Sequence, residues 1–423
     1  MNTSARTGGA LRRVDRPLAR AVQRVTATPL GPHQSAVLRI GVSATYLLFL
    51  LRELPHRHEL YGPDSPWHWE MARRLVADNQ AFTALMWSDS TIWFEAVYAL
   101  TLVSSVLLMV GWRTRATSVL FMAGVLSLQN RSVFMGDGGD NVIHLMAVYL
   151  VLTRCARVWS LDARREALDA VRVAEGGRPA RDVAGPALWA LSACALLPAT
   201  LAGGLGGTRW LPVLLWVLWL GNGLWWALNR SAAAREPRAL LDVLANIAHN
   251  AALLVIMAEV CLIYATAGWY KIQGSRWQDG TAIHYPLKLD YFTPWPALSG
   301  LVASSALVVM VLTYATVILQ VAFPFTLLNR KVKNVLLVLM IGEHVGIAVL
   351  LGLPFFSLAM IAADAVFLPT AFLVWLGGRA TRGRRRLFSR VTGGARVPRP
   401  RQPGDDGGEA PPHGDGPGHT LVG

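Results

Sequence analysis

Several side chains that could carry acid–base chemistry lie inside, or at the edge of, long apolar stretches of this sequence. Glu343 and His344 interrupt one such stretch, and Lys271 follows another at the point where it should leave a bilayer. Asn141 and His144 begin a third and, being three residues apart, share one face of a helix. An ionisable group is energetically unfavourable in hydrocarbon, so each of these is a candidate for proton transfer or for binding a polar ligand.

Each candidate also has a purely structural interpretation. Lys271 could extend its ammonium to the lipid headgroups beside Trp269, Tyr270 and Trp277, as interfacial lysines do. It can act as a base only in its neutral form, which desolvation favours. A lone buried histidine is more often a hydrogen-bonded core residue, and we expect this of His249.

A metal centre and the common catalytic motifs have no support in the sequence. His56, His58 and His68, with Asp64 among them, fit no metal-ligand spacing and are expected to be solvated loop residues. The three cysteines form no CxxC pair. No Walker loop, GxSxG, HExxH or dinucleotide fingerprint occurs, so nucleotide, serine-hydrolase and zinc-protease chemistry are not indicated.

The composition predicts an all-α, polytopic membrane protein that would place these side chains on transmembrane helices. Of 423 residues, 53% are hydrophobic and 16% are charged, and the mean hydropathy is +0.38. We expect about nine to ten transmembrane helices, because some apolar runs are shorter than the roughly 20 residues of a straight crossing. The runs are 36–51, 91–110, 116–128, 142–152, 188–202, 211–228, 247–267, 298–327, 335–351 and 355–376.

Basic residues concentrate in alternate loops. The N-terminal segment, every second loop and the tail after Gly377 are rich in arginine, whereas the intervening loops are mixed, acidic or nearly uncharged. The positive-inside rule then places both termini in the cytosol, and the long loops 52–90 and 268–296 outside, on the side of Lys271. The formal net charge of +14 is thus attributed to topology, and no nucleic-acid partner is expected.

Three regions follow from these patterns. We expect a basic cytosolic tail at 1–35, in which the arginines would also suit a transit peptide but no signal-peptide core is present. A transmembrane domain at 36–376 follows. The remainder, 377–423, should be an arginine-rich segment on anionic lipid headgroups and then a disordered Pro/Gly-rich tail. The expected location is a bacterial plasma membrane.

The segment around Lys271 resembles the vitamin K-dependent gamma-carboxylases. Residues 264–272 read YATAGWYKI and are followed by Trp277 and Gly280, similar to a segment of those enzymes in which a helix ends in Ala-Gly and a lysine. Lys271 matches the catalytic lysine of that segment. Further matches, which together cover most of 36–369, are Arg113, 127–131, Asp140, Asn141, His144, WSLD at 159–162 and His344. With LYGPD at 60–64, they mark the bacterial branch called the horizontally transferred transmembrane domain (HTTM) family.

Two departures limit what this resemblance implies. Tyr270 stands where the carboxylases have the first lysine of a pair. The animal enzymes also carry a large lumenal domain that helps to place the glutamate substrate, whereas only the tail follows the last apolar run here. Membrane chemistry is therefore implied more directly than carboxylation of protein glutamate.

The resemblance implies a quinone-dependent, carboxylase-like lyase acting on a peptide or small molecule. Its cofactor would be a reduced quinone of the menaquinone or vitamin K type. Lys271 would deprotonate the quinone hydroxyl, reaction with oxygen would give a strong alkoxide base, and that base would take a proton from a substrate carbon. The quinone oxygens would be held by Asn141, His144 and His344, and its ring would be flanked by Trp269, Tyr270 and Trp277.

A non-catalytic function is the alternative. In this hypothesis the chain is a membrane partner in peptide maturation, export or immunity, and its outer loops form a docking surface. The two hypotheses differ at Lys271, which is essential to an enzyme and dispensable to a docking protein.

Overall fold

The computed structural model describes residues 19–206, 209–229 and 235–391. The parts of the predicted tails before residue 19 and after residue 391 lie outside these ranges. The chain divides into two compact units, 1–374 and 375–423. Everything that follows on the site concerns the first unit.

The regular elements of the described residues are helices, as the sequence predicts. Short 3₁₀ turns such as η6 (Phe323–Leu328) and η7 (Ala365–Phe367) connect several of them. The helices are α2 (Pro32–Glu53), α3 (Arg57–Leu60), α4 (Trp69–Asn79), α5 (Thr91–Val110), α6 (Thr114–Arg131), α7 (Gly138–Leu152), α8 (Leu161–Ala174), α9 (Ala184–Leu201), α10 (Trp210–Leu228), α11 (Arg235–Gln273), α12 (Ser275–Gln278), α13 (Pro296–Ala303), α14 (Ala306–Ala322), α15 (Arg330–Leu350), α16 (Pro354–Asp364) and α17 (Thr370–Val391).

Among the described residues, seven helices are long and apolar enough to cross a membrane, or eight if the bent pair α16–α17 is one span. The expectation of nine to ten spans is therefore too high. Helices α6 and α7 account for the difference, because α6 has polar ends and α7 is only 15 residues long. Both are partly enclosed by other helices rather than by lipid. The remaining long apolar helices indicate an integral membrane protein.

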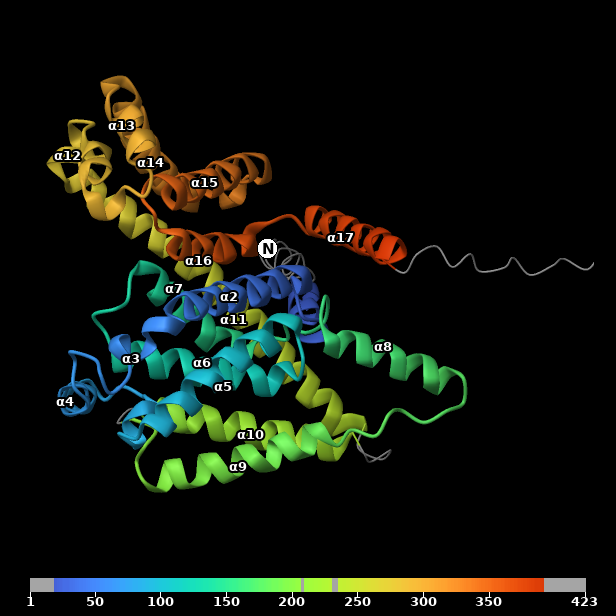
Figure 1. Cartoon of the computed structure of the whole chain (residues 1–423). Coiled ribbons are helices and arrows are strands. Elements are labelled where there is room, and N and C mark those ends of the chain that lie inside the picture. Colours follow the sequence, from blue (N-terminus) through green and yellow to red (C-terminus); the bar gives the residue numbers. More distant parts are fainter. Residues whose placement is uncertain (1–18, 207–208, 230–234, 392–423) are drawn as a thin grey trace, which may run out of the picture. The chain divides into compact units, whose positions relative to one another are not determined.

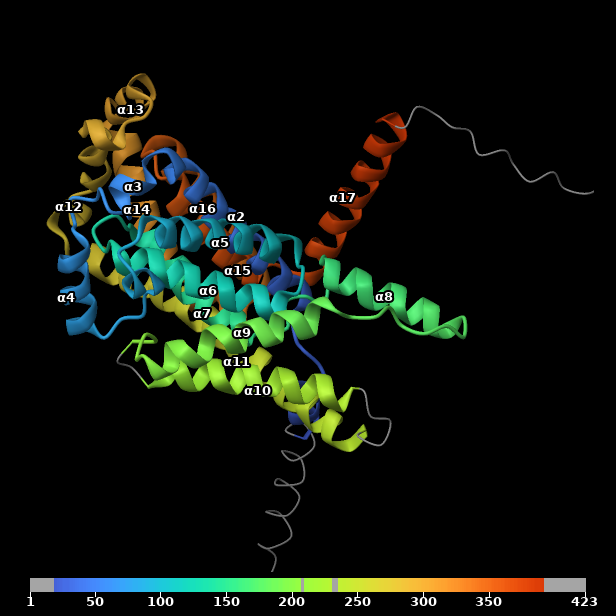
Figure 2. The same ribbon diagram turned by 60° about the horizontal axis from the view of Figure 1, so that its bottom comes forward.

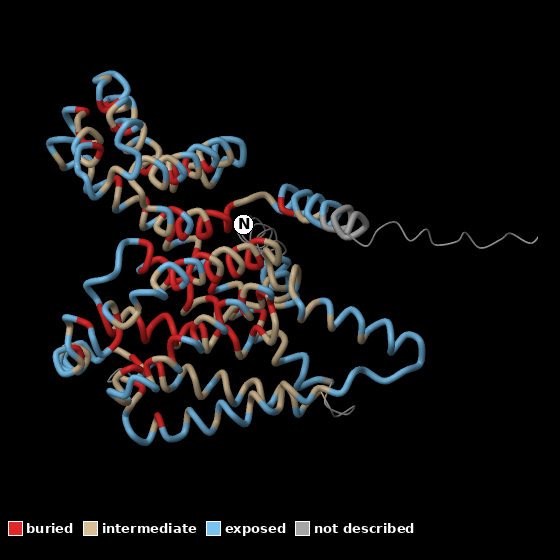
Figure 3. Tube along the Cα trace, viewed as in Figure 1, coloured by how far each residue is buried: buried red, intermediate tan, exposed pale blue. Residues whose placement is uncertain are grey.

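Helices α2, α5, α6, α7 and α16 pack together, and α11 lies against α7 (Figures 1 and 2). Most of the buried residues belong to this bundle (Figure 3). Small residues permit the close approach of its helices. A Cβ added at Gly124 of α6 would lie 2.3 Å from the Thr101 Oγ1 of α5, and one at Gly41 would lie 2.6 Å from the Ala362 Cβ.

One buried charge ties three parts of the bundle together. The Arg39 side chain of α2 is fully buried. Its guanidinium donates to the Met109 carbonyl oxygen at the end of α5, at 2.7 Å, and to the Trp159 carbonyl oxygen, at 2.8 Å. A third bond goes to the Leu108 carbonyl oxygen. These carbonyls satisfy a cation that lipid could not.

Helices α9 and α10 form a hairpin on the edge of the bundle, against α11 (Figure 1). Among the described residues of the two helices, only Ala199 of α9 and Leu211 of α10 are buried, as expected for helices that face lipid. Trp189 and Trp219 join them: their rings stack at 4.3 Å, and each indole N–H donates to the other residue's carbonyl oxygen at 3.0 Å.

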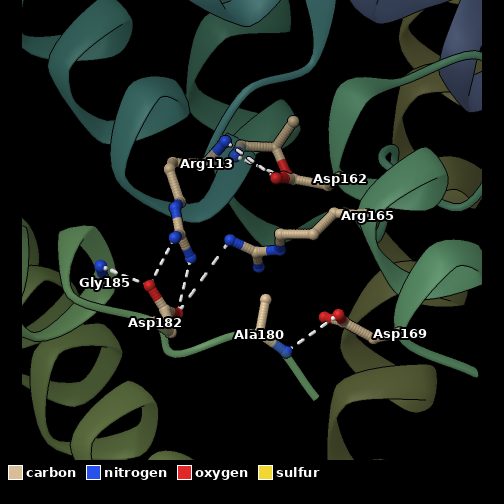
Figure 4. A network of polar contacts seen from close by, with 8 residues as sticks. Arg113, Asp162, Arg165, Asp169, Ala180, Asp182 and Gly185 are labelled. Carbon is tan, nitrogen blue, oxygen red and sulfur yellow. Dashed lines mark hydrogen bonds and ion pairs between the residues drawn. The ribbon is translucent and has the colours of Figure 1, made fainter. Parts of the chain in front are cut away.

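A polar network holds the segment that carries α8 (Figure 4). The Arg113 guanidinium pairs with the Asp182 carboxylate, which also accepts from the Gly185 N–H at 2.9 Å. The Asp162 carboxylate accepts from the Arg113 and Thr114 backbone N–H groups, both at 2.9 Å, and so caps the start of α6.

Helix α11 differs from the expected span. It continues without a break to Gln273, six residues beyond the predicted end at Ala267, and its 39 residues extend about 58 Å by helical rise. Gly268 lets the helix pack closely on α14, because a Cβ there would lie 2.6 Å from the Val321 Cγ2. Lys271 therefore lies on the last turn of a packed helix and not in a loop.

Candidate functional site

Lys271 begins a hydrogen-bonded chain across three helices. Its Nζ donates to the Gln320 Oε1 of α14 at 2.8 Å, and the Gln320 Nε2 donates to the Glu343 Oε1 of α15 at 2.7 Å. Gln320 is only 6% exposed, and Lys271 and Glu343 are half-buried. The Lys271 Nζ also lies 5.2 Å from the centre of the Trp277 ring, within the range of a cation–π contact.

A second polar group adjoins this chain. The Tyr264 hydroxyl of α11 donates to the Asp364 Oδ2 of α16 at 2.8 Å and lies 3.0 Å from the His344 Nε2 of α15. All three side chains are buried, with 0 to 2% exposure. Tyr264 is seven residues before Lys271, hence on the same face of α11 and about 10 Å away along its axis. Since His344 follows Glu343, the two networks are neighbours on both helices.

The bonds of Tyr264 link the tautomer of neutral His344 to the charge of Asp364. With Asp364 ionised, the single hydroxyl proton goes to Asp364, and the Tyr264 oxygen accepts from the His344 Nε2–H. The other ring nitrogen, Nδ1, is then an acceptor. It has no hydrogen-bond partner within the described chain, and the same holds for the Glu343 Oε2 and the Asp364 Oδ1. Buried acceptors without partners mark a place where a donor such as a ligand hydroxyl or water can bind.

Asn141 and His144 lie elsewhere, in a pocket of about 370 Å³ at the start of α7. The Gln129 Nε2 donates to the Asp140 carbonyl oxygen at 2.9 Å, so its Oε1 accepts from the His144 Nδ1–H at 3.1 Å. Neutral His144 therefore keeps Nε2 as a hydrogen-bond acceptor. The pocket is lined by Tyr46, Phe49, Tyr61, Leu128, Gln129, Asn130, Ser132, Val133, Gly136, Asp137, Gly138, Asp140, Asn141 and His144.

The segment that contributes Tyr61 to this pocket belongs to the outer loop 52–90. The buried Arg131 guanidinium of α6 holds it by donating to the Trp67 carbonyl oxygen at 2.8 Å and to the Gly62 carbonyl oxygen at 3.3 Å. Part of the predicted outer loop thus borders the pocket.

Phe356 of α16 lies close to both the pocket and the His344 group. The Phe356 ring of α16 contacts the His344 ring edge-on, at 5.6 Å between centres. A Cβ added at Gly138, which lines the pocket, would lie 3.2 Å from the same Phe356 ring, and one at Gly139 would lie 2.7 Å from the Phe356 Cα.

The predicted site residues therefore fall into three places. Lys271 and Trp277 contact each other, His344 lies in the adjoining group, and Asn141 and His144 share the pocket. The other two predicted aromatic residues are largely exposed: Trp269 by 63% and Tyr270 by 74%. At 100° per helical residue, they point about 200° and 100° away from Lys271, because α11 is still helical there.

Gln320, Tyr264 and Asp364 were not predicted as site residues. Asp364 is the only carboxylate in the apolar run 355–376, so the criterion applied to Glu343 would have found it. Gln320 and Tyr264 are uncharged and carry no comparable signal in the sequence.

The other intramembrane polar residues have structural partners. His249 is a hydrogen-bonded core residue, as expected: its Nδ1 accepts from the Arg154 N–H at 2.9 Å, and its Nε2 lies 2.8 Å from the Leu30 carbonyl oxygen. Glu259 accepts from the Tyr149 hydroxyl at 2.8 Å. The described residues contain no cluster of three or more side chains that could hold a metal ion.

Comparisons of this chain with protein families, with characterised proteins and with solved structures found no match. The resemblance to the HTTM family therefore stays a prediction from the sequence.

Proposed function

We propose that this protein performs acid–base chemistry on a ligand held among its membrane helices, in the form of a quinone-dependent, carboxylase-like reaction on a peptide or small molecule. The observation that supports it is the contiguous set of Lys271, Gln320, Glu343, His344 and Asp364, with buried acceptor atoms that lack partners within the described chain.

The types of residue present suit a reduced quinone, which has two hydroxyl groups and an aromatic ring. The His144 Nε2 and the His344 Nδ1 are each able to accept from a ligand hydroxyl, and the volume of the pocket that contains His144 lies in the range of small-molecule sites. Tyr46, Phe49 and Tyr61 supply aromatic walls. When bound, a reduced quinone supplies the electrons for a reaction with oxygen.

The residues of this chain would bind the ligand and move its proton. Lys271 in its neutral form would accept a hydroxyl proton, and His344 would accept a hydrogen bond at Nδ1. Because Lys271 is not among the residues that line the pocket of His144, the hydroxyl that it deprotonates would have to lie at the Lys271 network itself, within hydrogen-bond distance of the Nζ.

Oxygen uptake tests this proposal. The purified protein in nanodiscs is given reduced menaquinone or vitamin K between pH 6 and 10. Lys271→Ala and Lys271→Arg should both abolish uptake, because arginine stays protonated at any accessible pH. Lys288→Ala, at an exposed lysine of the same outer segment, should keep the activity of the wild type. Absence of uptake by the wild type, or uptake by the arginine variant, rejects the proposal.

A second candidate is the docking protein, and one observation favours it. The outer segment after α12 exposes large aromatic side chains, including Tyr291 by 86%, Trp295 by 61% and Tyr285 by 44%. Aromatic residues are enriched at protein interfaces. If docking is the function, Tyr291→Ala or Trp295→Ala should abolish co-purification of a cross-linked partner from the native membrane, and Lys271→Ala should not.

The proposed topology places both termini in the cytosol of a bacterium and the outer segment of α12 outside its plasma membrane. Eight spans, counted with the bent pair α16–α17 as one, give the even number of crossings that this condition requires. Tags at Met1 and Gly423 should be inaccessible to a reagent added to intact cells. Labelling of either tag from outside contradicts this topology.

A further inference from the structure

Gln320 occupies an unusual position between two groups of opposite charge. Its amide oxygen accepts from the Lys271 Nζ at 2.8 Å, while its amide nitrogen donates to the Glu343 Oε1 at 2.7 Å. Within the described chain, no carboxylate oxygen, including those of Glu343, lies within 4.0 Å of the Lys271 Nζ. The neutral amide therefore separates an amine and a carboxylate that would otherwise be free to pair.

The chemistry of the amide matters for the proton on Lys271. An amide oxygen can accept a hydrogen bond from –NH₃⁺ and equally from –NH₂, so the contact with Gln320 survives loss of the proton. A carboxylate in direct contact would instead stabilise the charged form strongly in this partly desolvated place. A lysine in such an ion pair is a poor base.

Among the described residues, the other charged groups on the neighbouring elements have contacts of their own, and the Asp364 carboxyl of α16 bonds to the Tyr264 hydroxyl. On α12 and the turn after it, Arg276 and Asp279 pair with each other at 3.5 Å and are exposed. On α15, His344 bonds to Tyr264. The Trp277 ring favours the ammonium form, but a cation–π contact does so less strongly than a charge-assisted hydrogen bond to a carboxylate. The separation by Gln320 therefore keeps the Glu343 carboxylate out of direct contact with the Lys271 amine.

We infer that Gln320 is a positioning residue that holds Lys271 and Glu343 in one hydrogen-bonded chain while preventing their ion pair, which leaves the Lys271 amine able to release its proton. The inference rests on the proposed function for its purpose, since a base must be neutral before it acts. It concerns Gln320 acting through Lys271 and does not require contact with the ligand.

The test exchanges the two side chains. In the variant Gln320→Glu/Glu343→Gln the same groups are present, but the carboxylate now lies next to the Lys271 amine. The rate of reductive methylation measures the neutral fraction of each lysine, and mass spectrometry reads it site by site. The sequence has lysine only at positions 271, 288, 331 and 333, of which Lys288 and Lys331 are exposed and serve as internal standards.

Relative to these standards, Lys271 of the exchange variant should be methylated at least about tenfold more slowly than Lys271 of the wild type at pH 7 to 9. A rise of one unit in the pKa of a mostly protonated amine lowers its neutral fraction about tenfold. In the single variant Glu343→Gln, Lys271 should be methylated no more slowly than Lys271 of the wild type. Equal rates at Lys271 in the exchange variant and the wild type, within about twofold, overturn the inference. If the exchange variant does not fold, Gln320→Glu alone is measured against the same criterion.

The methylation result does not depend on catalysis. If the wild type shows no quinone-dependent oxygen uptake, the proposed function fails, but the comparison of Lys271 between variants still decides the role of Gln320. If uptake is present, the exchange variant should show it only at higher pH than the wild type. An unchanged pH profile also counts against the inference.

Discussion

Tyr264→Phe is the substitution that best tests whether the buried polar group on α11, α15 and α16 is a connected unit. It removes one oxygen atom and leaves the shape of the side chain unchanged. The Asp364 Oδ2 and the His344 Nε2 both lose their partner, and both residues are buried, at 0% and 2% exposure. No other atom of the chain needs to move.

The expected loss of stability follows from these contacts. A buried polar group left without a partner costs about 1–3 kcal/mol, so two groups would cost about 2–6 kcal/mol. Hydrogen bonds between membrane helices contribute less than this, about 0.6–1.7 kcal/mol, because the helices also find partners in the unfolded reference state. We therefore expect Tyr264→Phe to destabilise the protein by about 1–3 kcal/mol. The double variant Tyr264→Phe/Asp364→Ala should lose about 0.5–2 kcal/mol less stability than the sum of the losses of the two single variants.

The measurement is unfolding by SDS in mixed micelles, followed by tryptophan fluorescence. Tyr314→Phe is the matched control, since it makes the same chemical change at a side chain that is 39% exposed and bonds to the Gln278 carbonyl oxygen. It should cost less than about 1 kcal/mol. If Tyr264→Phe is no more destabilising than Tyr314→Phe, or if its effect simply adds to that of Asp364→Ala, the group is not a connected unit.

Two further predictions concern stability. Partial burial raises the pKa of the Asp182 carboxyl, but hydrogen bonds and charge from Arg113 outweigh this and hold the pKa below its ordinary value. Asp182 should therefore stabilise the protein at neutral pH and lose this effect as the pH falls below about 4, a dependence that Asp182→Asn should remove from the acid unfolding curve. Gly41→Ala should cost about 1–3 kcal/mol, because its Cβ would meet Ala362 at 2.6 Å, whereas Gly221→Ala, with no atom within 4 Å, should cost nothing. Thermal unfolding in detergent compares these two glycine variants directly.

The positions of the helices could be predicted from the sequence, because a helix that faces lipid needs a long apolar run and such runs are visible. Each predicted run corresponds to a helix, although the eighth is broken at Ser304 and Ser305 and the tenth before Pro369. The number of crossings could not be predicted as well. A short or polar-ended run such as α7 or α6 can be a helix enclosed by others, and hydropathy does not distinguish this from a crossing.

The candidate site was predictable only where a charge lay in an apolar run. Lys271 and His344 were found in this way, whereas Gln320 is neutral and becomes visible only when α14 lies between α11 and α15. The aromatic residues depend on the local backbone. The resemblance implied that Trp269 flanks a ligand, but the helix continues past Trp269 and rotates it to the far side of Lys271.

Arg39 has a consequence for how the chain is made. Its charge lies about 10 Å from the start of α2, the first long apolar helix, and an arginine inside a single inserted helix is unfavourable by about 2.5–3.5 kcal/mol. The carbonyl groups that satisfy it come from Met109 and Trp159, which a ribosome adds 70 and 120 residues later. We therefore predict that α2 enters the bilayer stably only after synthesis has passed Trp159. Chains truncated before and after that residue should differ in carbonate-resistant insertion of α2, and equal insertion would show that the first helix needs no later partner.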